Sequence, residues 1–147
     1  MGRGWNNQLV AYNIDGNKWE WPETNGQTPS PRAALAGFQY RSLVYLFGGR
    51  LQGTRLNDLY VLDLKSMSWS EKYILEFNSL VLQPLIFQKF SLNPGKFFPC
   101  GRSWHSFTYI GSSKAILYGG LSAEGEVMGI GTFIIFQIQI NIKLAFF

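Results

Sequence analysis

Cysteine and histidine, side chains widely used in metal sites and in nucleophilic catalysis, each occur once in this chain, as Cys100 and His105. One cysteine cannot form a disulfide within the chain or a cysteine-based zinc site. The sequence shows no Ser/His/Asp order, no glycine-rich phosphate loop and no cluster of paired carboxylates. A lone histidine beside a predicted strand favours a packed, hydrogen-bonded role over a catalytic one. We therefore expect no enzyme, no metal and no cofactor, and binding is the function that is left.

The composition favours short strands joined by tight turns. Aromatic residues make up 16% of the 147 residues, charged residues make up only 15%, and there are 16 glycines. These proportions predict a single all-β domain. The 13 basic residues, which give a net charge of +4, are scattered along the chain, so we expect no patch for nucleic acid or membrane. The single cysteine fits a reducing compartment, the cytoplasm or the nucleus.

An internal repeat shows which elements must position any binding residues. The segment Asn57–Trp69 lies over Asn7–Trp19 at an offset of 50 residues. Each segment predicts a hairpin with an alternating first strand, a polar turn at residues 15–17 or 65–66, and a second strand that carries the tryptophan. The same two-stranded unit therefore occurs twice.

A second pair of segments repeats in the same way. Pro29–Arg32 leads through the apolar strand Leu43–Phe47 to a Gly-Gly pair, and Pro99–Arg102 leads through Ala115–Tyr118 to another. This order, completed by the hairpin with its tryptophan, resembles the kelch repeat, which builds one four-stranded propeller blade from about 50 residues. The resemblance implies an all-β kelch β-propeller fragment of about two four-stranded antiparallel blades. An unrelated β-sandwich is the alternative.

The repeat divides the chain into four parts. Residues 1–72 hold the end of one blade and one complete blade, and residues 99–125 hold the first half of a further blade. Residues 73–98 form an atypical apolar insertion and residues 126–147 an atypical hydrophobic tail, and we expect both to be non-homologous sequence from a splice or gene-model event. Within the tail, Phe136–Lys143 alternates with period two and predicts a strand. Because a propeller closes with about four to eight blades, we expect no closed ring from this chain.

Four segments carry a closer resemblance. They are Arg3–Asn6, Pro29–Ala34, Gly48–Leu59 and Gly101–His105, and they are similar to the central blades of the kelch domain-containing protein 1 and 2 type. This family consists of substrate receptors of cullin-RING ubiquitin ligases, whose propeller mouth binds a substrate C-terminus that typically ends in glycine. A C-terminal helical box in the family contacts elongins B and C and, through them, a cullin. Nothing after Gly125 resembles that box, so we expect this chain to lack the contacts of a ligase adaptor.

The resemblance implies a site for a peptide C-terminus at Arg50, Arg55, Ser103 and Trp5, which match the family's pocket. Two guanidinium groups and a hydroxyl suit a terminal carboxylate, because arginine offers two donors in one plane. Trp5 would form an apolar wall that strengthens these bonds. In the alternative interpretation, both arginines are solvated loop residues and Ser103 caps a turn.

Other aromatic residues and other functions complete the expectations. Trp69 and Trp104 are expected in the seams between blades rather than in contact with a ligand. Some kelch-like propellers are copper oxidases, but one histidine and one cysteine cannot supply such a site. The competing function is a generic kelch scaffold that binds a folded protein across its blade faces.

Overall fold

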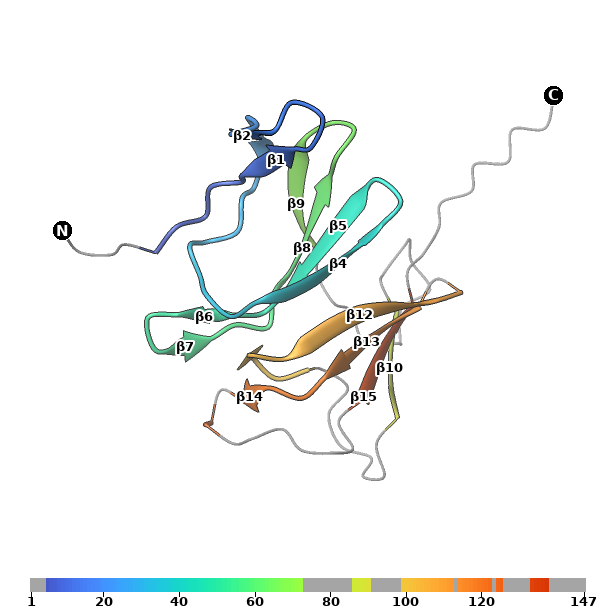
Figure 1. Cartoon of the computed structure of the whole chain (residues 1–147). Coiled ribbons are helices and arrows are strands. Elements are labelled where there is room, and N and C mark those ends of the chain that lie inside the picture. The colour runs from blue at the N-terminus through green and yellow to red at the C-terminus, as the bar shows by residue number, and fades with distance from the viewer. Residues whose placement is uncertain are drawn as a thin grey trace.

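The computed structural model describes residues 5–72, 86–90, 99–112, 114–122, 124–125 and 133–137 (Figure 1). Every named element in these ranges is a β-strand. The described residues include no helix that is long and apolar enough to cross a membrane. The all-β class expected from the glycine and aromatic content is confirmed.

The first sheet lies within residues 1–72 of the chain. Its four antiparallel strands are β4 (Ala36–Tyr40), β5 (Leu43–Phe47), β8 (Leu59–Asp63) and β9 (Ser68–Lys72), in that spatial order. The short strand β3 (Asn25–Gly26) pairs in parallel with the outer edge of β9. Apolar residues fill both faces of β8, which is the pattern of a strand buried on two sides.

The second sheet also has four antiparallel strands, but their origin differs from the first. β12 (Ser106–Gly111) and β13 (Lys114–Tyr118) form an antiparallel pair within residues 99–125. β15 (Phe133–Gln137) then pairs with β13, and β10 (Ile86–Phe90) pairs with the outer edge of β15. One strand from the predicted insertion and one from the predicted tail thus complete this sheet. The predicted strand at Phe136–Lys143 overlaps β15 at its first two residues, and the rest of it lies outside the described residues.

Three short two-stranded elements accompany the two sheets. The hairpin β1 (Ala11–Asn13) and β2 (Lys18–Glu20) precedes the first sheet. The ribbon of β6 (Arg50–Leu51) and β7 (Thr54–Arg55) connects β5 to β8. The ribbon of β11 and β14, which pairs Arg102–Ser103 with Leu121–Ser122, lies beside the second sheet. No sheet in the described ranges closes on itself.

The two sheets pack face to face through a hydrophobic core. The edge strands β4 and β12 of the two sheets lie side by side (Figure 1). The rings of Phe38 and Phe107 meet edge to face, with their centroids 4.6 Å apart, and the rings of Tyr40 and Tyr109 lie 4.7 Å apart. The buried members of this core are Tyr45, Phe47, Leu59, Val61, Phe107, Ala115 and Leu117. Such stacking of neighbouring sheets is the arrangement expected of adjacent propeller blades.

The opposite face of the first sheet buries a second cluster. Tyr60, Leu62 and Trp69 pack there with the partly buried Leu9, which comes from the segment that leads into β1. The expectation that Trp69 lies in a seam is confirmed. The same expectation for Trp104 is wrong, because that side chain is 63% exposed.

Candidate anion-binding site

Glycine pairs bring the loops of the two sheets into contact. Gly48 follows β5 with a φ of 63°, and a Cβ there would lie 2.8 Å from the carbonyl oxygen of Arg102. Gly120, the second glycine after β13, has a φ of 92° and a Cβ position 2.6 Å from the carbonyl oxygen of Ser103. Both positions need the conformation and the small size of glycine. This close approach lets the backbone N–H of Gly49 donate to the Arg102 carbonyl at 2.9 Å.

The β6–β7 ribbon presents two arginines directly opposite each other. Arg50 and Arg55 are cross-strand partners in its antiparallel register, so their side chains leave the ribbon on the same face. The backbone of Arg50 is also tied to Ala33, with bonds of 2.8 and 3.0 Å in the two directions. The ribbon is therefore a supported base for two guanidinium groups.

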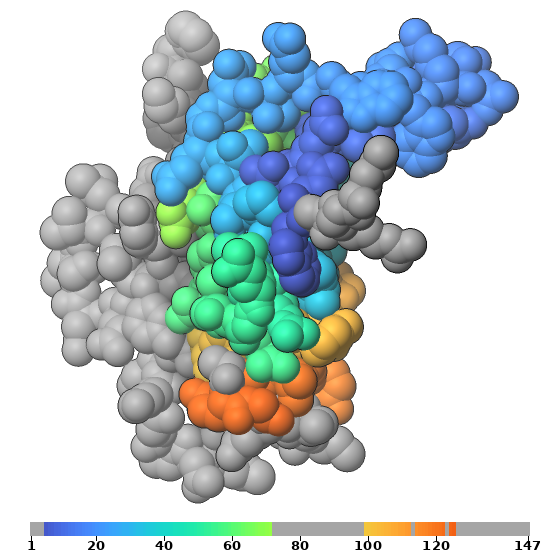
Figure 2. Space-filling view, turned by 90° about the vertical axis from the view of Figure 1, so that its left-hand side faces the viewer, coloured from blue at the N-terminus to red at the C-terminus, as the bar shows by residue number. Residues whose placement is uncertain are grey.

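Ser103 joins this ribbon from β11, which lies beside the second sheet. The Nε of Arg55 donates to its Oγ at 3.1 Å, and the backbone N–H of Arg102 donates to the carbonyl of Leu56 at 3.1 Å. In Figure 2 the segment that contains β6 and β7 (green) and the segment that contains β14 (orange) lie on one face of the molecule. Because the Ser103 side chain is fully buried, its hydroxyl holds Arg55 in place in this structure.

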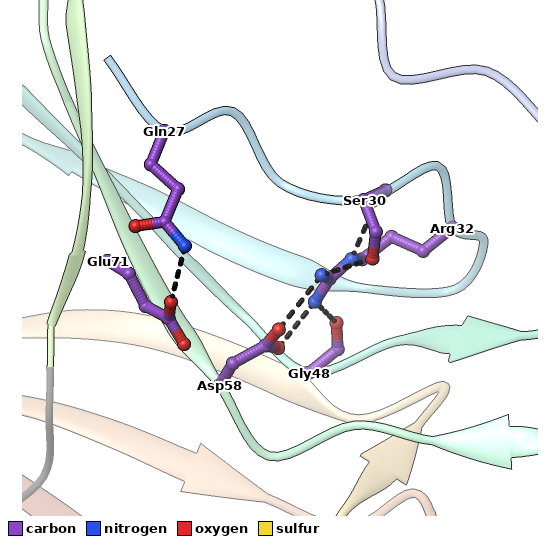
Figure 3. A network of polar contacts seen from close by, with 6 residues as sticks. All are labelled: Gln27, Ser30, Arg32, Gly48, Asp58 and Glu71. Carbon is purple, nitrogen blue, oxygen red and sulfur yellow. Dashed lines mark hydrogen bonds and ion pairs between the residues drawn. The ribbon is translucent and has the colours of Figure 1, made fainter.

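Two other arginines, Arg32 and Arg102, use their guanidinium groups for hydrogen bonds within the protein. Arg32 pairs with the carboxylate of Asp58, with an Nη2–Oδ2 distance of 2.9 Å, and donates to Ser30 and to the carbonyl of Gly48 (Figure 3). Arg102 occupies the same place in the second sheet, where its guanidinium donates to the carbonyls of Cys100 and Gly119, each at 3.3 Å.

These structural roles escaped the prediction from sequence. The arginine that ends each Pro/Arg segment, at positions 32 and 102, was a signal that could have revealed them, because it recurs at the same place in the repeat. Both side chains are almost completely buried, and a buried guanidinium needs several acceptors.

Arg50 and Arg55 differ from these two in their partners. No ion pair to a carboxylate involves either of them among the residues that the structure describes. The Nε of Arg50 is buried and has no hydrogen-bond partner in the same part of the chain. An anion that reaches this Nε would supply the acceptor that the described residues do not.

Trp5 is the one predicted site residue that the structure does not join to the others. It is 45% exposed and lies in an extended segment ahead of β1. No ring contact or hydrogen bond among the described residues connects it to Arg50, Arg55 or Ser103. The structure thus brings together three of the four predicted residues.

His105 is packed, as expected, but the expected hydrogen bond is not found, because both ring nitrogens are buried without a hydrogen-bond partner among the described residues. Its ring is almost fully buried and meets Phe47 edge to face, with a centroid distance of 5.6 Å. Burial, assisted by the positive charge of Arg102, lowers the pKa of His105 to about 4, and the approach of the Phe47 backbone opposes this shift only in part. The described residues hold no cluster of three or more histidine, cysteine or acidic side chains that could bind a metal.

Comparison with known proteins identifies the repeat. Residues 2–84 match the KLHDC2/KLHL20/DRC7 Kelch-repeats domain. The chain is 34% identical over 124 residues to Kelch domain-containing protein 2 of Bos taurus, an alignment that covers 84% of this chain and 26% of that protein. It is 34% identical over 122 residues to Kelch domain-containing protein 1 of Homo sapiens, with 82% and 25% covered. It is 33% identical over 119 residues to Host cell factor homolog hcf-1 of Caenorhabditis elegans, with 80% and 13% covered.

The extent of these matches fits the fold described above. The chain spans about a quarter of the length of the two kelch domain-containing proteins. Its two stacked four-stranded sheets correspond to neighbouring blades of a propeller. The chain therefore belongs to the KLHDC2/KLHL20/DRC7 kelch-repeats family and carries a protein-binding kelch module of the type found in Kelch domain-containing proteins 1 and 2.

Proposed function

We propose that this kelch module binds the C-terminal carboxylate of a protein that ends in glycine. Arg50 and Arg55 clamp the carboxylate with their guanidinium groups, and Ser103 positions Arg55. Trp5 contributes an apolar wall when the peptide is bound. The observation that carries the proposal is the placement of two arginines opposite each other, neither with a carboxylate partner among the described residues.

The chemistry favours a terminal carboxylate over other anions of a protein. A planar guanidinium binds a carboxylate through two parallel hydrogen bonds, and two such groups on one ribbon surround both oxygens. At a C-terminus the carboxylate ends the chain, so the site does not have to make room for a following residue. A final glycine also has no side chain that could collide with the ribbon.

The function of a longer protein with this module follows from the same binding. We propose that it selects substrates for a cullin-RING ubiquitin ligase, with elongins B and C as the link to a cullin, in the cytoplasm or the nucleus. The module itself acts by binding and carries out no catalysis. In this proposal the chain supplies the peptide-binding residues.

A pair of peptides tests the carboxylate clamp. One peptide ends in Gly with a free carboxylate, and the other has the same sequence with an amidated C-terminus. We expect calorimetry to show at least tenfold tighter binding of the free acid, because only that form offers a charge to the two arginines. Arg50→Ala and Arg55→Ala should each weaken binding of the acid several-fold and leave the amide unchanged.

The same measurement separates the proposal from its competitor. A generic scaffold that binds a folded partner across its blade faces would treat the acid and the amide alike. Equal affinity for the two peptides would therefore exclude the clamp and favour the scaffold. Lys114→Ala, an exposed basic residue on β13, is the control for a general loss of positive charge.

A further inference from the structure

The segment that leads into the first sheet carries two hydroxyl residues, each followed directly by proline. Residues 27–32 read Gln-Thr-Pro-Ser-Pro-Arg and belong to no strand. Each proline fixes its own φ and favours extended backbone at the residue before it. Thr28 is exposed and Ser30 is half-buried. A hydroxyl that precedes proline in an extended segment outside any sheet has the form of substrate that proline-directed protein kinases accept.

Of the two hydroxyls, that of Ser30 lies beside an ion pair of the fold. Its Oγ accepts a hydrogen bond from the Nη2 of Arg32 at 2.8 Å (Figure 3). The Oδ2 of Asp58 accepts from the same nitrogen at 2.9 Å. Two acceptors that share one nitrogen are close neighbours, so a negative charge added to Ser30 would lie directly beside the Asp58 carboxylate.

The guanidinium of Arg32 has no unused donor to offer such a charge. It carries five N–H groups. The Nε donates to the carbonyl of Ser30 at 3.0 Å, the Nη1 donates to the carbonyl of Gly48 at 3.0 Å and to Asp58, and the Nη2 makes the two bonds given above. New acceptors at Ser30 can therefore be satisfied only by donors that Asp58 or Gly48 now uses.

We propose that Ser30 is a phosphorylation site at which a proline-directed protein kinase breaks the ion pair of Arg32 and Asp58. The kinase transfers the γ-phosphoryl group of ATP. The bond from the γ-phosphorus to the β–γ bridging oxygen breaks, a P–O bond to the Ser30 Oγ forms, the hydroxyl proton leaves and ADP is released. At neutral pH the phosphate carries a charge of about −1.5 to −2, which exceeds the single positive charge of Arg32.

The surroundings of Asp58 make the two anions compete for one cation. The Asp58 side chain is 21% exposed, so water screens it only in part, and the part of the chain that the structure describes gives it no second ion pair. The phosphate and the carboxylate repel each other, and Arg32 pairs with the more highly charged phosphate. Arg32 then leaves Asp58 and the carbonyl of Gly48.

This loss loosens the loop from Gly48 to Asp58. The two ends of the loop are held together by the hydrogen bond from the Gly48 N–H to the Asp58 carbonyl, at 3.0 Å, and by the contacts of Arg32 with both residues. The loop carries the ribbon of β6 and β7. The phosphorylation site depends on an ion pair of the fold and not on the carboxylate clamp, so either proposal can fail without the other.

A kinase reaction on the full chain tests the site itself. The chain is incubated with ATP and a purified mitogen-activated protein kinase, and mass spectrometry of its peptides locates the phosphate. We expect phosphate on Ser30, and Pro31→Ala, which removes the directing proline, should reduce it at least tenfold. Thr28→Ala is the control and should leave the phosphate on Ser30 unchanged. Absence of phosphate from Ser30, or equal modification in Pro31→Ala, would overturn the proposal.

Encoded phosphoserine tests the effect on the ion pair. Phosphoserine at position 30 should lower the melting temperature by about 5 °C or more, whereas phosphoserine at the exposed position 28 adds the same charge and should leave it almost unchanged. In Asp58→Asn the phosphate meets no carboxylate and becomes the counter-charge of Arg32, so there it should raise the melting temperature. An Asp58→Asn chain that folds only with the phosphate would support the proposal in the same way.

Hydrogen exchange shows where the modified chain loosens. With phosphoserine at position 30, exchange at residues 50–55 should be at least tenfold faster, and exchange in β12 should change much less. Equal destabilisation by phosphoserine at positions 28 and 30 would assign the effect to charge alone and overturn the proposal. The same destabilisation in Asp58→Asn as in the unaltered chain, or a melting temperature that does not fall in the unaltered chain, would also overturn it.

Discussion

The Nε of Arg55, on a loop of the first sheet, donates a hydrogen bond of 3.1 Å to the Oγ of Ser103, on a loop of the second. The two residues are 48 positions apart, so this bond depends on the packing of one blade against the next. It also fixes one of the two guanidinium groups that we propose as a carboxylate clamp. Stability and ligand binding are therefore linked at this contact.

Removal of the Ser103 hydroxyl should affect both properties. Ser103→Ala deletes a fully buried acceptor and should lower the free energy of unfolding by about 1 kcal/mol. Affinity for a Gly-ended peptide should fall several-fold, because Arg55 is then free to turn away. Chemical denaturation and calorimetry measure the two effects. Ser106→Ala, at an exposed position on β12, should change neither, and an unaltered affinity in Ser103→Ala would remove Ser103 from the site.

The ion pair of Arg32 and Asp58 should be a main support of the first blade. The Arg32 side chain is 4% exposed, so Asp58→Ala leaves a buried cation without its counter-charge and should cost about 3 to 5 kcal/mol of stability. Arg32→Lys should recover little, because an ammonium cannot reach Asp58, Ser30 and Gly48 together. Thermal unfolding measures both variants. Loss of the exposed pair Lys18–Glu20 through Glu20→Ala is the control and should leave the melting temperature almost unchanged.

Gly48 should tolerate no side chain. Its positive φ and its approach to the Arg102 carbonyl mean that Gly48→Ala strains the backbone and pushes the two loops apart, at a cost of about 1 to 3 kcal/mol. Gly53, at the tip of the β6–β7 ribbon, has open space around it, so Gly53→Ala is the matched control. Equal melting temperatures for the two variants would contradict the required close approach.

Turn residues and hydrophobic periodicity in the sequence predicted those parts of the fold that involve residues close together in the chain. The hairpin turns, the strand Leu43–Phe47 and the buried Trp69 follow from periodicity and turn residues that lie within a few positions of each other. The pairing of β10 with β15 joins residues more than 40 positions apart, and no nearby residue signals it. Trp104 was misplaced because its φ of 55° turns the side chain away from the seam that an extended strand would have given it.

Some features of the candidate site could likewise be predicted from the sequence, and others could not. Arg50 and Arg55 follow the Gly-Gly pair on one loop, so their proximity is a property of a short ribbon that the sequence could indicate. The fully buried state of Ser103 and the burial of Arg102 depend on how two sheets stack, and this requires the three-dimensional arrangement. Trp5 precedes the first strand, and nothing local fixes its distance from the loop arginines.

His105 should make the protein less stable in acid. Its pKa in the folded state is about 4, against 6.5 for an unperturbed histidine, so between these values the unfolded state binds a proton that the folded state does not. Acidification from pH 7 therefore lowers the free energy of unfolding, and the loss is complete below about pH 4, where it reaches on the order of 3 kcal/mol. Urea denaturation at a series of pH values measures this change.

A variant isolates the histidine from the carboxylates that titrate in the same range. His105→Gln keeps a polar side chain of similar size and cannot take up the proton, so its stability should fall less steeply between pH 6.5 and pH 4. The difference between the two proteins should grow through that window in favour of the variant and level off below it. Parallel curves for the two proteins would show that His105 titrates normally and that its burial beside Arg102 carries no cost in acid.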